Sequence, residues 1–432
     1  MTPPSPPSPP SPPPPSPSWL DDGLAHIWLP YTQMKTAPAP LPVAATRGTR
    51  ITLDNGRELI DGIGSWWTAV HGYNHPALLA AARDQLARMP HVMLGGLANE
   101  PAYRLAAKLA ALAPGDLDRV FFSESGSVSV EIAMKMALQF QAQTGHPERT
   151  KFAAFTGGYH GDTLATMAVC DPDEVMHALF SGGLTVQRIT ELPTTPERAA
   201  DLDRLLAEAG DVAAVLVEPL IQGAGGMRMH APDTLRALRR VCDSHGALLI
   251  ADEIFSGLGR TGALFACAHA GIAPDIMTLS KALTGGVAPL AATVASSRVF
   301  DAFLDDDPER CFMHGPTYTG HAMNCAIALA SLELFDSEPR LEQVRALEAR
   351  MREGLGALEG VPAVRDVRVT GAVGAVELER LDDLAGLRAR FLDAGVFIRP
   401  LGRVIYLAPA YVIDERDLEL LMTAITREVR AL

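Results

Sequence analysis

The stretch that decides the fold is residues 276–286, which read IMTLSKALTGG. The first four residues form a short apolar run, as expected of a strand that is buried on both faces of a parallel sheet. Lys281 follows this run almost directly, so its side chain should lie at the carboxyl end of the strand and away from water. Burial of this kind lowers the pKa of a lysine and makes it a usable nucleophile. The stretch therefore predicts a buried strand that delivers a reactive lysine.

Further apolar runs of this type precede Lys281, and segments with helical patterns lie between several of them. We predict strands at Arg119–Phe122, Lys151–Phe155, Val212–Val217, Ala247–Ala251 and Ile276–Leu279, and helices at Val130–Gln143 and Pro232–His245. Alternation of strands and helices predicts an α/β fold, with a mostly parallel sheet flanked by helices and joined by right-handed crossovers.

Composition and pattern divide the rest of the chain. Residues 1–18 hold 11 of the 33 prolines, so we expect a disordered, extended tail there. A proline-rich ligand for an SH3-like partner is the less favoured alternative for this tail. We do not expect an export signal, because the tail lacks the charged start and the apolar segment of a signal peptide. Residues 19–65 should belong to a smaller α+β domain, which residues 322–432 complete with long helices followed by strands. Residues 66–321 should form the large domain.

Composition also excludes several classes of function. The formal net charge is −14 and no run of Lys and Arg exceeds two residues, so the chain lacks the basic patch that a nucleic acid or an anionic membrane requires. No apolar stretch reaches the roughly 18 residues needed to cross a bilayer. The five cysteines are scattered and never form a C-x-x-C pair. This usage is typical of reduced core residues in a cytoplasmic protein without disulfides or a zinc site.

The loop after the first predicted strand has the residues that a phosphate requires. Ser125, Gly126 and Ser127 precede a helix expected to begin near Val128. Small residues at a helix start expose backbone N–H groups beside the positive end of the helix dipole, which suits a phosphate. An ordinary serine N-cap is the alternative.

The loop after the second predicted strand surrounds an aromatic residue with glycines. Gly157, Gly158 and Gly161 flank Tyr159, so the backbone can approach a flat ligand while the ring offers a stacking face. A glycine-rich surface turn is the alternative. The nearby pair of His160 and Asp162 lacks a third ligand, so we expect no metal site.

The last two predicted strands deliver an acid and an amine. Asp252 ends an otherwise buried strand, which is costly unless a cation or a strong donor meets it, and Lys281 ends the next. A buried ion pair between Asp252 and Lys281 is the alternative. Together with the two loops, the pair fits pyridoxal phosphate (PLP): the lysine for a Schiff base, the carboxylate for the pyridine nitrogen, and the loops for the phosphate and the ring. Once released, the lysine can also carry a proton.

One further motif needs a different interpretation. Residues 257–262 match G-x-G-x-x-G, and Asp275 follows 18 residues after the first glycine, as in a dinucleotide-binding fold. The context does not fit, because Asp275 begins the next strand instead of ending it. We therefore interpret the motif as a glycine-rich loop without a nicotinamide cofactor.

The segments around these residues resemble the class III aminotransferases of PLP fold type I. The resemblance covers nearly everything from Trp19 to the C-terminus, and it is most specific around Lys281. It rests on SGS at 125–127, GGYHG at 157–161, EP at 218–219, DE at 252–253 and SKALTGG at 280–286.

Five other pieces narrow the resemblance within this family. They are WLPY at 28–31, SWWTAVHG at 65–72, HVMLGG at 91–96, HGPT at 314–317 and RPL at 399–401. They are similar to members that aminate 8-amino-7-oxononanoate in biotin biosynthesis, with S-adenosylmethionine as the amino donor. The resemblance thus implies a cytoplasmic, PLP-dependent transaminase that acts as a homodimer on small molecules.

The resemblance also implies roles for individual residues. For the cofactor, it implies a Schiff base at Lys281, a pyridine-nitrogen partner at Asp252 and a catalytic ring contact at Tyr159. It also implies that Gly126 and Ser127 bind the phosphate. Pro316 and Thr317 would join them from the partner subunit. For the substrate, it implies a pocket of Tyr31, Trp66, Tyr159, Lys281 and Gly315, with Arg399 binding the carboxylate. Trp67 and Arg403 are alternatives to Trp66 and Arg399 for substrate contact.

Three activities remain as alternatives. Another ω-aminotransferase, acting on a diamine or 4-aminobutyrate, would use the same cofactor residues, and lysine is an alternative donor for the same acceptor. A PLP-binding regulator without catalysis is disfavoured, since the acidic chain has no DNA-binding footprint. The sequence departs from the usual family pattern at Phe255, Ser256 and His321, which affects the expected donor preference rather than the reaction class.

Overall fold

The computed structural model describes residues 18–172 and 179–432, and its centre is a seven-stranded sheet. The strand order is β4-β12-β11-β10-β7-β5-β6, and every strand runs parallel to its neighbours except β12, which is antiparallel to both β11 and β4. The strands are β4 (Leu117–Ser123), β5 (Lys151–Phe155), β6 (Arg188–Thr190), β7 (Val212–Val217), β10 (Leu248–Asp252), β11 (Ile276–Leu279) and β12 (Ala291–Ser296). The five predicted strands are therefore confirmed, whereas β6 and β12 were not predicted.

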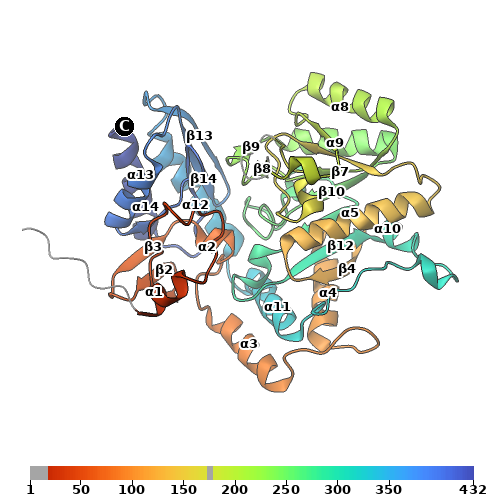
Figure 1. The fold of residues 1–432 in the computed structure, drawn as a ribbon, viewed down its shortest axis with the longest axis horizontal. Helices are drawn as coiled ribbons and strands as arrows, with labels where there is room; N and C mark the ends of the chain where they lie inside the picture. Colours follow the sequence, from red (N-terminus) through yellow and green to blue (C-terminus); the bar gives the residue numbers. More distant parts are fainter. Residues whose placement is uncertain (1–17, 173–178) are drawn as a thin grey trace, which may run out of the picture.

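Helices cover both faces of this sheet because its strands are apolar on both sides. Val215, Val217 and Leu249 pack with α8 (Pro196–Ala209) and α9 (Pro232–His245). Leu216 and Ile250, one residue away along the same strands, pack with α5 (Gly126–Gln143) on the opposite face. Figure 1 shows these helices on the two sides of the sheet. The expected α/β architecture is confirmed.

The remaining helices have the following bounds: α1 (Ser18–Leu24), α2 (Gly64–Trp67), α3 (Pro76–Arg88), α4 (Glu100–Leu112), α6 (Leu164–Met167), α10 (Ser297–Asp301), α11 (Ala322–Ser337), α12 (Arg340–Gly356), α13 (Leu384–Asp393) and α14 (Glu415–Arg430). Short 3₁₀ turns are η1 (Ser181–Gly183), η2 (Ala266–Ala270), η3 (Lys281–Thr284) and η4 (Pro308–Arg310). No helix within the described ranges is long and apolar enough to cross a membrane.

Smaller sheets lie beside the large one (Figure 1). Three antiparallel strands, β13 (Val364–Thr370), β14 (Val373–Leu378) and β16 (Val404–Leu407), form one of them. A second has the order β1-β2-β3-β15, with β1 (Val43–Arg47), β2 (Arg50–Leu53), β3 (Glu58–Asp61) and β15 (Val396–Phe397). A two-stranded ribbon joins β8 (Ile221–Gln222) and β9 (Arg228–Met229).

The parallel pairing of β15 with β3 joins the first and last parts of the chain in one sheet. The domain boundaries expected at residues 65 and 321 stay predictions. Residues 1–17, nearly all of the expected tail, lie outside the described residues. Ser18 already begins α1, so the segment after the tail is less irregular than expected.

Candidate active site

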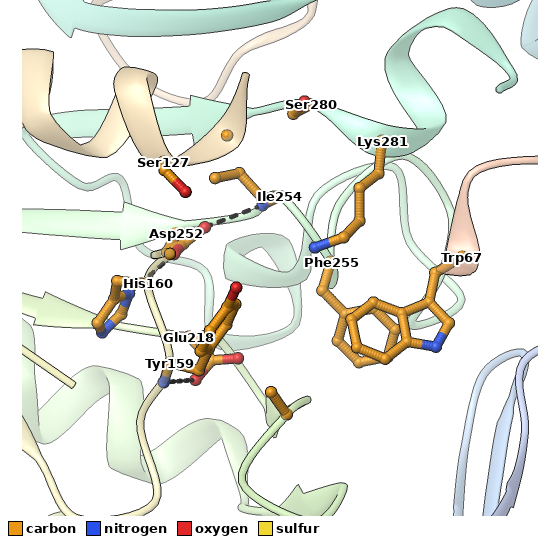
Figure 2. A pocket seen from close by; sticks show the side chains of 13 residues that line it. Trp67, Ser127, Tyr159, His160, Glu218, Asp252, Ile254, Phe255, Ser280 and Lys281 are labelled. Carbon is orange, nitrogen blue, oxygen red and sulfur yellow. Dashed lines mark hydrogen bonds and ion pairs between the residues drawn. The ribbon is translucent and has the colours of Figure 1, made fainter. Parts of the chain in front are cut away.

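A cavity with about 570 Å³ of space not filled by protein atoms opens at the carboxyl ends of the parallel strands. This edge is where open parallel sheets bind their ligands. In Figure 2, Asp252 and His160 lie on one side of the cavity and Lys281 reaches in from the other, above Trp67 and Phe255. The lining residues are Trp67, Gly126, Ser127, Tyr159, His160, Gly161, Glu218, Ala224, Asp252, Ile254, Phe255, Ser280 and Lys281. The residues predicted from four separate strand ends thus meet at one cavity.

Lys281 begins the short turn η3 directly after β11 and Ser280. Its φ of 46° is in the left-handed region, an unfavourable conformation for a residue with a Cβ, and such strain is typical of functional sites. Burial lowers the pKa of its ammonium group, against the opposing charges of Asp252, Glu218 and Asp162. The Nζ atom lies 4.9 Å from the centre of the Trp67 ring, on its face. The lysine therefore points into the cavity with a weakened preference for its proton.

Asp252 is fixed as the last residue of β10 and is almost fully buried. Its Oδ2 atom lies 2.8 Å from His160 Nδ1, and its Oδ1 atom accepts hydrogen bonds from the backbone N–H of Ile254 and the hydroxyl of Thr278. Within the described residues Asp252 and Lys281 form no ion pair, so the alternative of a structural salt bridge does not hold. The acid and the amine instead face the same space from different sides.

His160 is the partner of Asp252 that the sequence did not reveal as such. Burial alone would lower the pKa of this imidazole, but the hydrogen bond and the charge of Asp252 outweigh burial and raise it. The hydrogen bond from His160 Nδ1 fixes the orientation of the Asp252 carboxylate at the edge of the cavity. The only sequence signal was its position beside Tyr159 at a strand end. There we considered His160 as a metal ligand and expected no metal site.

Glu218 joins the loops that follow β5 and β7. Its two carboxylate oxygens accept the backbone N–H groups of Tyr159 and Gly223, each at 2.9 Å. Burial raises the pKa of Glu218 to about 7, although both hydrogen bonds oppose this shift. Glu218 therefore holds the Tyr159 loop against the sheet edge.

The N-terminus of α5 forms the far end of the cavity. Ser125 caps the helix by accepting the N–H of Val128, so the ordinary capping role predicted as an alternative is present. The helix begins at Gly126, slightly earlier than expected, and Gly126 and Ser127 line the cavity. Gly161 packs so closely that a Cβ atom there would lie 2.1 Å from Ser127 Oγ. Only glycine permits this approach of the two loops.

Tyr31 does not line this cavity, but it meets the cavity residue Tyr159 around Asp162. The hydroxyl of Tyr159 donates to Asp162 Oδ1 at 3.1 Å, the hydroxyl of Tyr31 donates to Oδ2, and the two hydroxyl oxygens are 3.4 Å apart. The Tyr31 ring also meets the Trp66 ring edge to face, with centroids 6.2 Å apart. Three residues predicted to contact substrate are therefore contiguous.

Trp66 and Trp67 lie on a left-handed turn, α2. Gly64, Ser65, Trp66 and Trp67 all have φ between 47° and 73°, and Asp61 holds the turn by accepting the N–H groups of Ile63 and Ser65. The reversed hand separates the two indoles. Trp67 packs on Phe255, with ring centroids 4.4 Å apart, and lines the cavity, whereas Trp66 is 43% exposed beside Tyr31.

The two candidate arginines differ in their partners. Arg403 forms an ion pair with Glu377 at 2.7 Å. Arg399 has no carboxylate partner among the described residues, and its guanidinium carbon lies 5.7 Å from the centre of the Trp66 ring. Arg399 therefore faces the cluster of Trp66 and Tyr31 with its charge uncompensated.

Gly315, Pro316 and Thr317 do not line the cavity of their own chain. They belong to the loop between η4 and α11, where Gly315 and Thr317 are exposed. His321, one of the departures from the family pattern, caps α11 and stacks on His91, with ring centroids 5.1 Å apart.

The G-x-G-x-x-G segment has a structural role. Arg260 within it is 1% exposed and donates hydrogen bonds to the carbonyls of Ala372, Pro409 and Trp67. It thus ties the loop after β10 to the small sheets and to α2.

Comparisons with known proteins agree with the chemistry of the cavity. The family model "Aminotransferase class-III" matches residues 31–429. A Corynebacterium glutamicum protein named adenosylmethionine-8-amino-7-oxononanoate aminotransferase is 42% identical over 413 residues, which are 94% of this chain and 97% of that protein.

Solved structures give the same result. The crystal structure of adenosylmethionine-8-amino-7-oxononanoate aminotransferase from Methanocaldococcus jannaschii has a TM-score of 0.90 and 31% identity, covering 96% of this chain and 98% of that one. An amine transaminase from an uncultivated Pseudomonas species, in its PLP-bound form, has a TM-score of 0.87 and 32% identity, covering 94% and 98%. PLP fold type I is confirmed by these neighbours.

Proposed function

The chain belongs to the class III aminotransferases and is a transaminase, and from this premise we propose that it aminates 8-amino-7-oxononanoate with S-adenosylmethionine as donor. The product would be 7,8-diaminononanoate, in biotin biosynthesis. One observation carries the choice of acceptor. The Lys281 amine lies over the Trp67 ring and the unpaired Arg399 guanidinium lies over the ring of the adjacent Trp66, so a ketone at the lysine could extend an apolar chain along the indoles and end in a carboxylate at Arg399.

The residues of the cavity fit pyridoxal phosphate. Lys281 would bind its aldehyde carbon, Asp252 its pyridine nitrogen, Tyr159 its ring, and the α5 N-terminus with Gly126 and Ser127 its phosphate. The buried amine of Lys281 and the buried carboxylate of Asp252 face one space without forming an ion pair with each other in the described part of the chain, which suits a ligand that has an aldehyde carbon and a pyridine nitrogen. When bound, PLP supplies an electron sink that accepts and returns an amino group.

The chain's own residues then have separate tasks. Lys281, whose pKa burial lowers, takes a proton from the substrate carbon at Nζ and returns it. His160 donates a hydrogen bond from Nδ1 to Asp252 and so fixes the orientation of the carboxylate that would pair with the pyridine nitrogen. Glu218 holds the backbone of Tyr159 in place. The Trp67 and Phe255 rings exclude water from the lysine.

Arg399 binds the acceptor's carboxylate in this proposal. A planar guanidinium forms two parallel hydrogen bonds to a carboxylate, which a lysine cannot do. Arg403 is already neutralised by Glu377, so it is the weaker candidate. Tyr31 and Trp66 would line the path between the carboxylate and the ketone, and Gly315 would reach it from the second copy of the proposed dimer.

A half-reaction screen tests the function. The PLP-loaded protein is mixed with S-adenosylmethionine, lysine, a diamine or 4-aminobutyrate, and the loss of visible absorption identifies the donor. Ketones are then screened for its return. We expect S-adenosylmethionine to remove the absorption and 8-amino-7-oxononanoate to restore it. Restoration by succinic semialdehyde alone would contradict the proposed acceptor, and removal by lysine but not S-adenosylmethionine would contradict the donor.

Two variants complete this screen. Lys281→Ala should lose both half-reactions, because no other amine reaches the cavity among the described residues. Arg399→Ala should weaken the use of 8-amino-7-oxononanoate by roughly 2 kcal/mol, the size of a lost charge-assisted hydrogen bond, and should spare the donor half-reaction. Equal damage to both halves would refute the role of Arg399.

We also propose a cytoplasmic homodimer with shared active sites. All five cysteines are free, as expected in a reducing compartment. Met93, Leu97, Met313 and Tyr318 are each at least half exposed, and their segments lie side by side, since the rings of His91 and Tyr318 are 5.0 Å apart. A second copy covering this surface would bring its Pro316 and Thr317 to the phosphate end of the cavity.

A further inference from the structure

A second arginine without a counter-charge lies beside Arg399. Arg388 projects from α13, is half-buried, and donates one hydrogen bond from Nη2 to the carbonyl of Pro400, the residue after Arg399, at 3.3 Å. Its Nε atom is buried and has no hydrogen-bond partner in the described part of the chain. Neither arginine has a carboxylate within ion-pair distance among those residues. Two guanidinium groups thus lie close together without neutralisation.

Other arginines of this region do not share this property. Arg368 and Arg403 both pair with Glu377, and Arg390 pairs with Glu428 at 2.6 Å. The chain therefore supplies carboxylates to the arginines around Arg388 and Arg399, but not to these two. Since an uncompensated, half-buried charge is costly, an anion that binds there gains from both.

The surroundings place both charges at the substrate side of the site. Burial and the charge of Arg399 lower the pKa of Arg388. Tyr406, on β16, has a pKa raised to about 12 by burial and is influenced by the charges of both arginines, and its ring lies 6.2 Å from that of Trp67. Arg399 in turn lies over Trp66. The two guanidinium groups therefore lie beside Trp66 and Tyr406, and Tyr406 in turn contacts Trp67, the ring that lies under Lys281.

We propose that Arg388 is a specificity-determining residue that shares the carboxylate of the acceptor with Arg399. The inference rests on the proposed function and extends it. One carboxylate between two guanidinium groups relieves their mutual repulsion. It also supplies a hydrogen-bond acceptor to Arg388 Nε, which otherwise has no partner in the described part of the chain. A neutral ketone of the same length leaves both charges uncompensated. The pair therefore selects acceptors with a distal carboxylate and discriminates against neutral ketones.

The test compares Arg388→Gln with the matched control Arg403→Gln, each loaded with PLP. KM and kcat are measured for 8-amino-7-oxononanoate and for its counterpart with a hydroxyl in place of the carboxylate, 2-amino-9-hydroxynonan-3-one, termed the neutral acceptor because its distal end is uncharged. In Arg388→Gln we expect KM for the carboxylate acceptor to rise about tenfold, the loss of one charge-assisted hydrogen bond, with kcat within about twofold. The neutral acceptor and the donor half-reaction should not change. Arg403→Gln should behave as wild type, and Arg388→Lys should recover part of the affinity.

A second probe keeps the proposal testable on its own. Hexanoate, which carries the carboxylate and the apolar chain without a ketone, should inhibit the wild-type holoenzyme competitively against any acceptor that it uses. Arg388→Gln should weaken this inhibition about tenfold, while hexanol inhibition stays unchanged. Equal hexanoate inhibition in both proteins, or an equal rise in KM for charged and neutral acceptors, would overturn the role of Arg388. A wild type that uses other acceptors but not 8-amino-7-oxononanoate would contradict only the proposed function.

Discussion

The hydrogen bond from His160 to Asp252 is the residue-scale feature with the clearest consequence for the cofactor. His160→Phe removes the 2.8 Å hydrogen-bond partner of a buried carboxylate, which then loses the contact that fixes its orientation. We expect PLP to bind about tenfold more weakly, as measured by titrating the cofactor-free protein. His146→Phe, at an exposed position, is the control and should leave the affinity unchanged. Equal affinities in His160→Phe and wild type would remove His160 from the site.

Glu253 gives a pH-dependent prediction at the same scale. Its carboxylate accepts the N–H groups of Ala266 and Cys267, and burial raises its pKa from 4.5 to about 7. The stabilisation tied to its protonated form is complete below pH 4.5 and is lost as the pH rises through 7. Gln cannot ionise, so the unfolding free energy of Glu253→Gln relative to wild type should increase by about 3 kcal/mol across this window.

Denaturant unfolding at several pH values measures this difference. The exposed Glu208→Gln is the control, and its difference from wild type should stay flat over the same range. A flat difference for Glu253→Gln would mean that the buried carboxylate ionises as it does in water.

Residues with a local signal were predictable, and residues whose role depends on a distant partner were not. Lys281 and Asp252 each follow an apolar run, so the sequence predicted both strands and the points at which they end. His160 and Trp67 gave no such signal, because their roles come from Asp252, 92 residues away, and from Lys281 across the cavity. The choice of Arg399 over Arg403 likewise depends on where Glu377 lies.

At the scale of elements, the left-handed turn α2 makes a specific requirement of Gly64. Its φ is +55°, and a Cβ atom there would lie 3.2 Å from the carbonyl oxygen of Ala408. Gly64→Ala should therefore destabilise the protein by about 1–2 kcal/mol and displace both indoles. We expect a thermal-unfolding midpoint below wild type together with a loss of the acceptor half-reaction.

Gly56→Ala separates strain from function. Gly56 has a φ of +79° with nothing within 4 Å of the added Cβ, and it lies in a turn away from the tryptophans. This variant should lose about 1 kcal/mol of stability and keep full activity. If Gly64→Ala also kept full activity, the turn would not position the substrate residues.

The elements that the sequence did not reveal have physical reasons. β12 reads AATVAS, and an alanine-rich run favours neither strand nor helix clearly, so only its neighbours β4 and β11 determine its conformation. The α2 turn could not be predicted because left-handed conformations are unfavourable locally and persist only where Asp61 and the surrounding structure hold them.

At the scale of the whole molecule, the proposed dimer predicts complementation between two inactive variants. Lys281→Ala lacks the amine, and Thr317→Asp would repel the phosphate in the partner's site. A hybrid of the two has one site with an intact lysine and an intact partner loop. Mixing, unfolding and refolding equal amounts should therefore restore about a quarter of wild-type activity, since half of the dimers are hybrids with one working site.

Two outcomes decide this prediction. A mixture that stays inactive while each variant refolds as a dimer would show that Thr317 serves its own subunit's site. A monomeric mass for wild type in light scattering would contradict the shared site altogether.

Long-range organisation was only partly predictable. The alternation of strands and helices indicated the large sheet and a second, smaller unit, because both patterns are local. The pairing of β15 with β3, more than 300 residues apart, left no local signal, and neither did the clamp that Arg260 forms between its loop and the small sheets.

The reversed hand of α2 also bears on the use of such an enzyme in preparative chemistry. Trp66 and Trp67 are consecutive but contact different parts of the site, so each can be redesigned separately. A combinatorial library at Trp66 should widen the range of bulky ketones that are accepted, whereas a non-aromatic replacement of Trp67 removes the aromatic face under Lys281. Inserting or deleting one amino acid in this turn would move both indoles away from their partners, so a designer should alter its side chains and preserve its length.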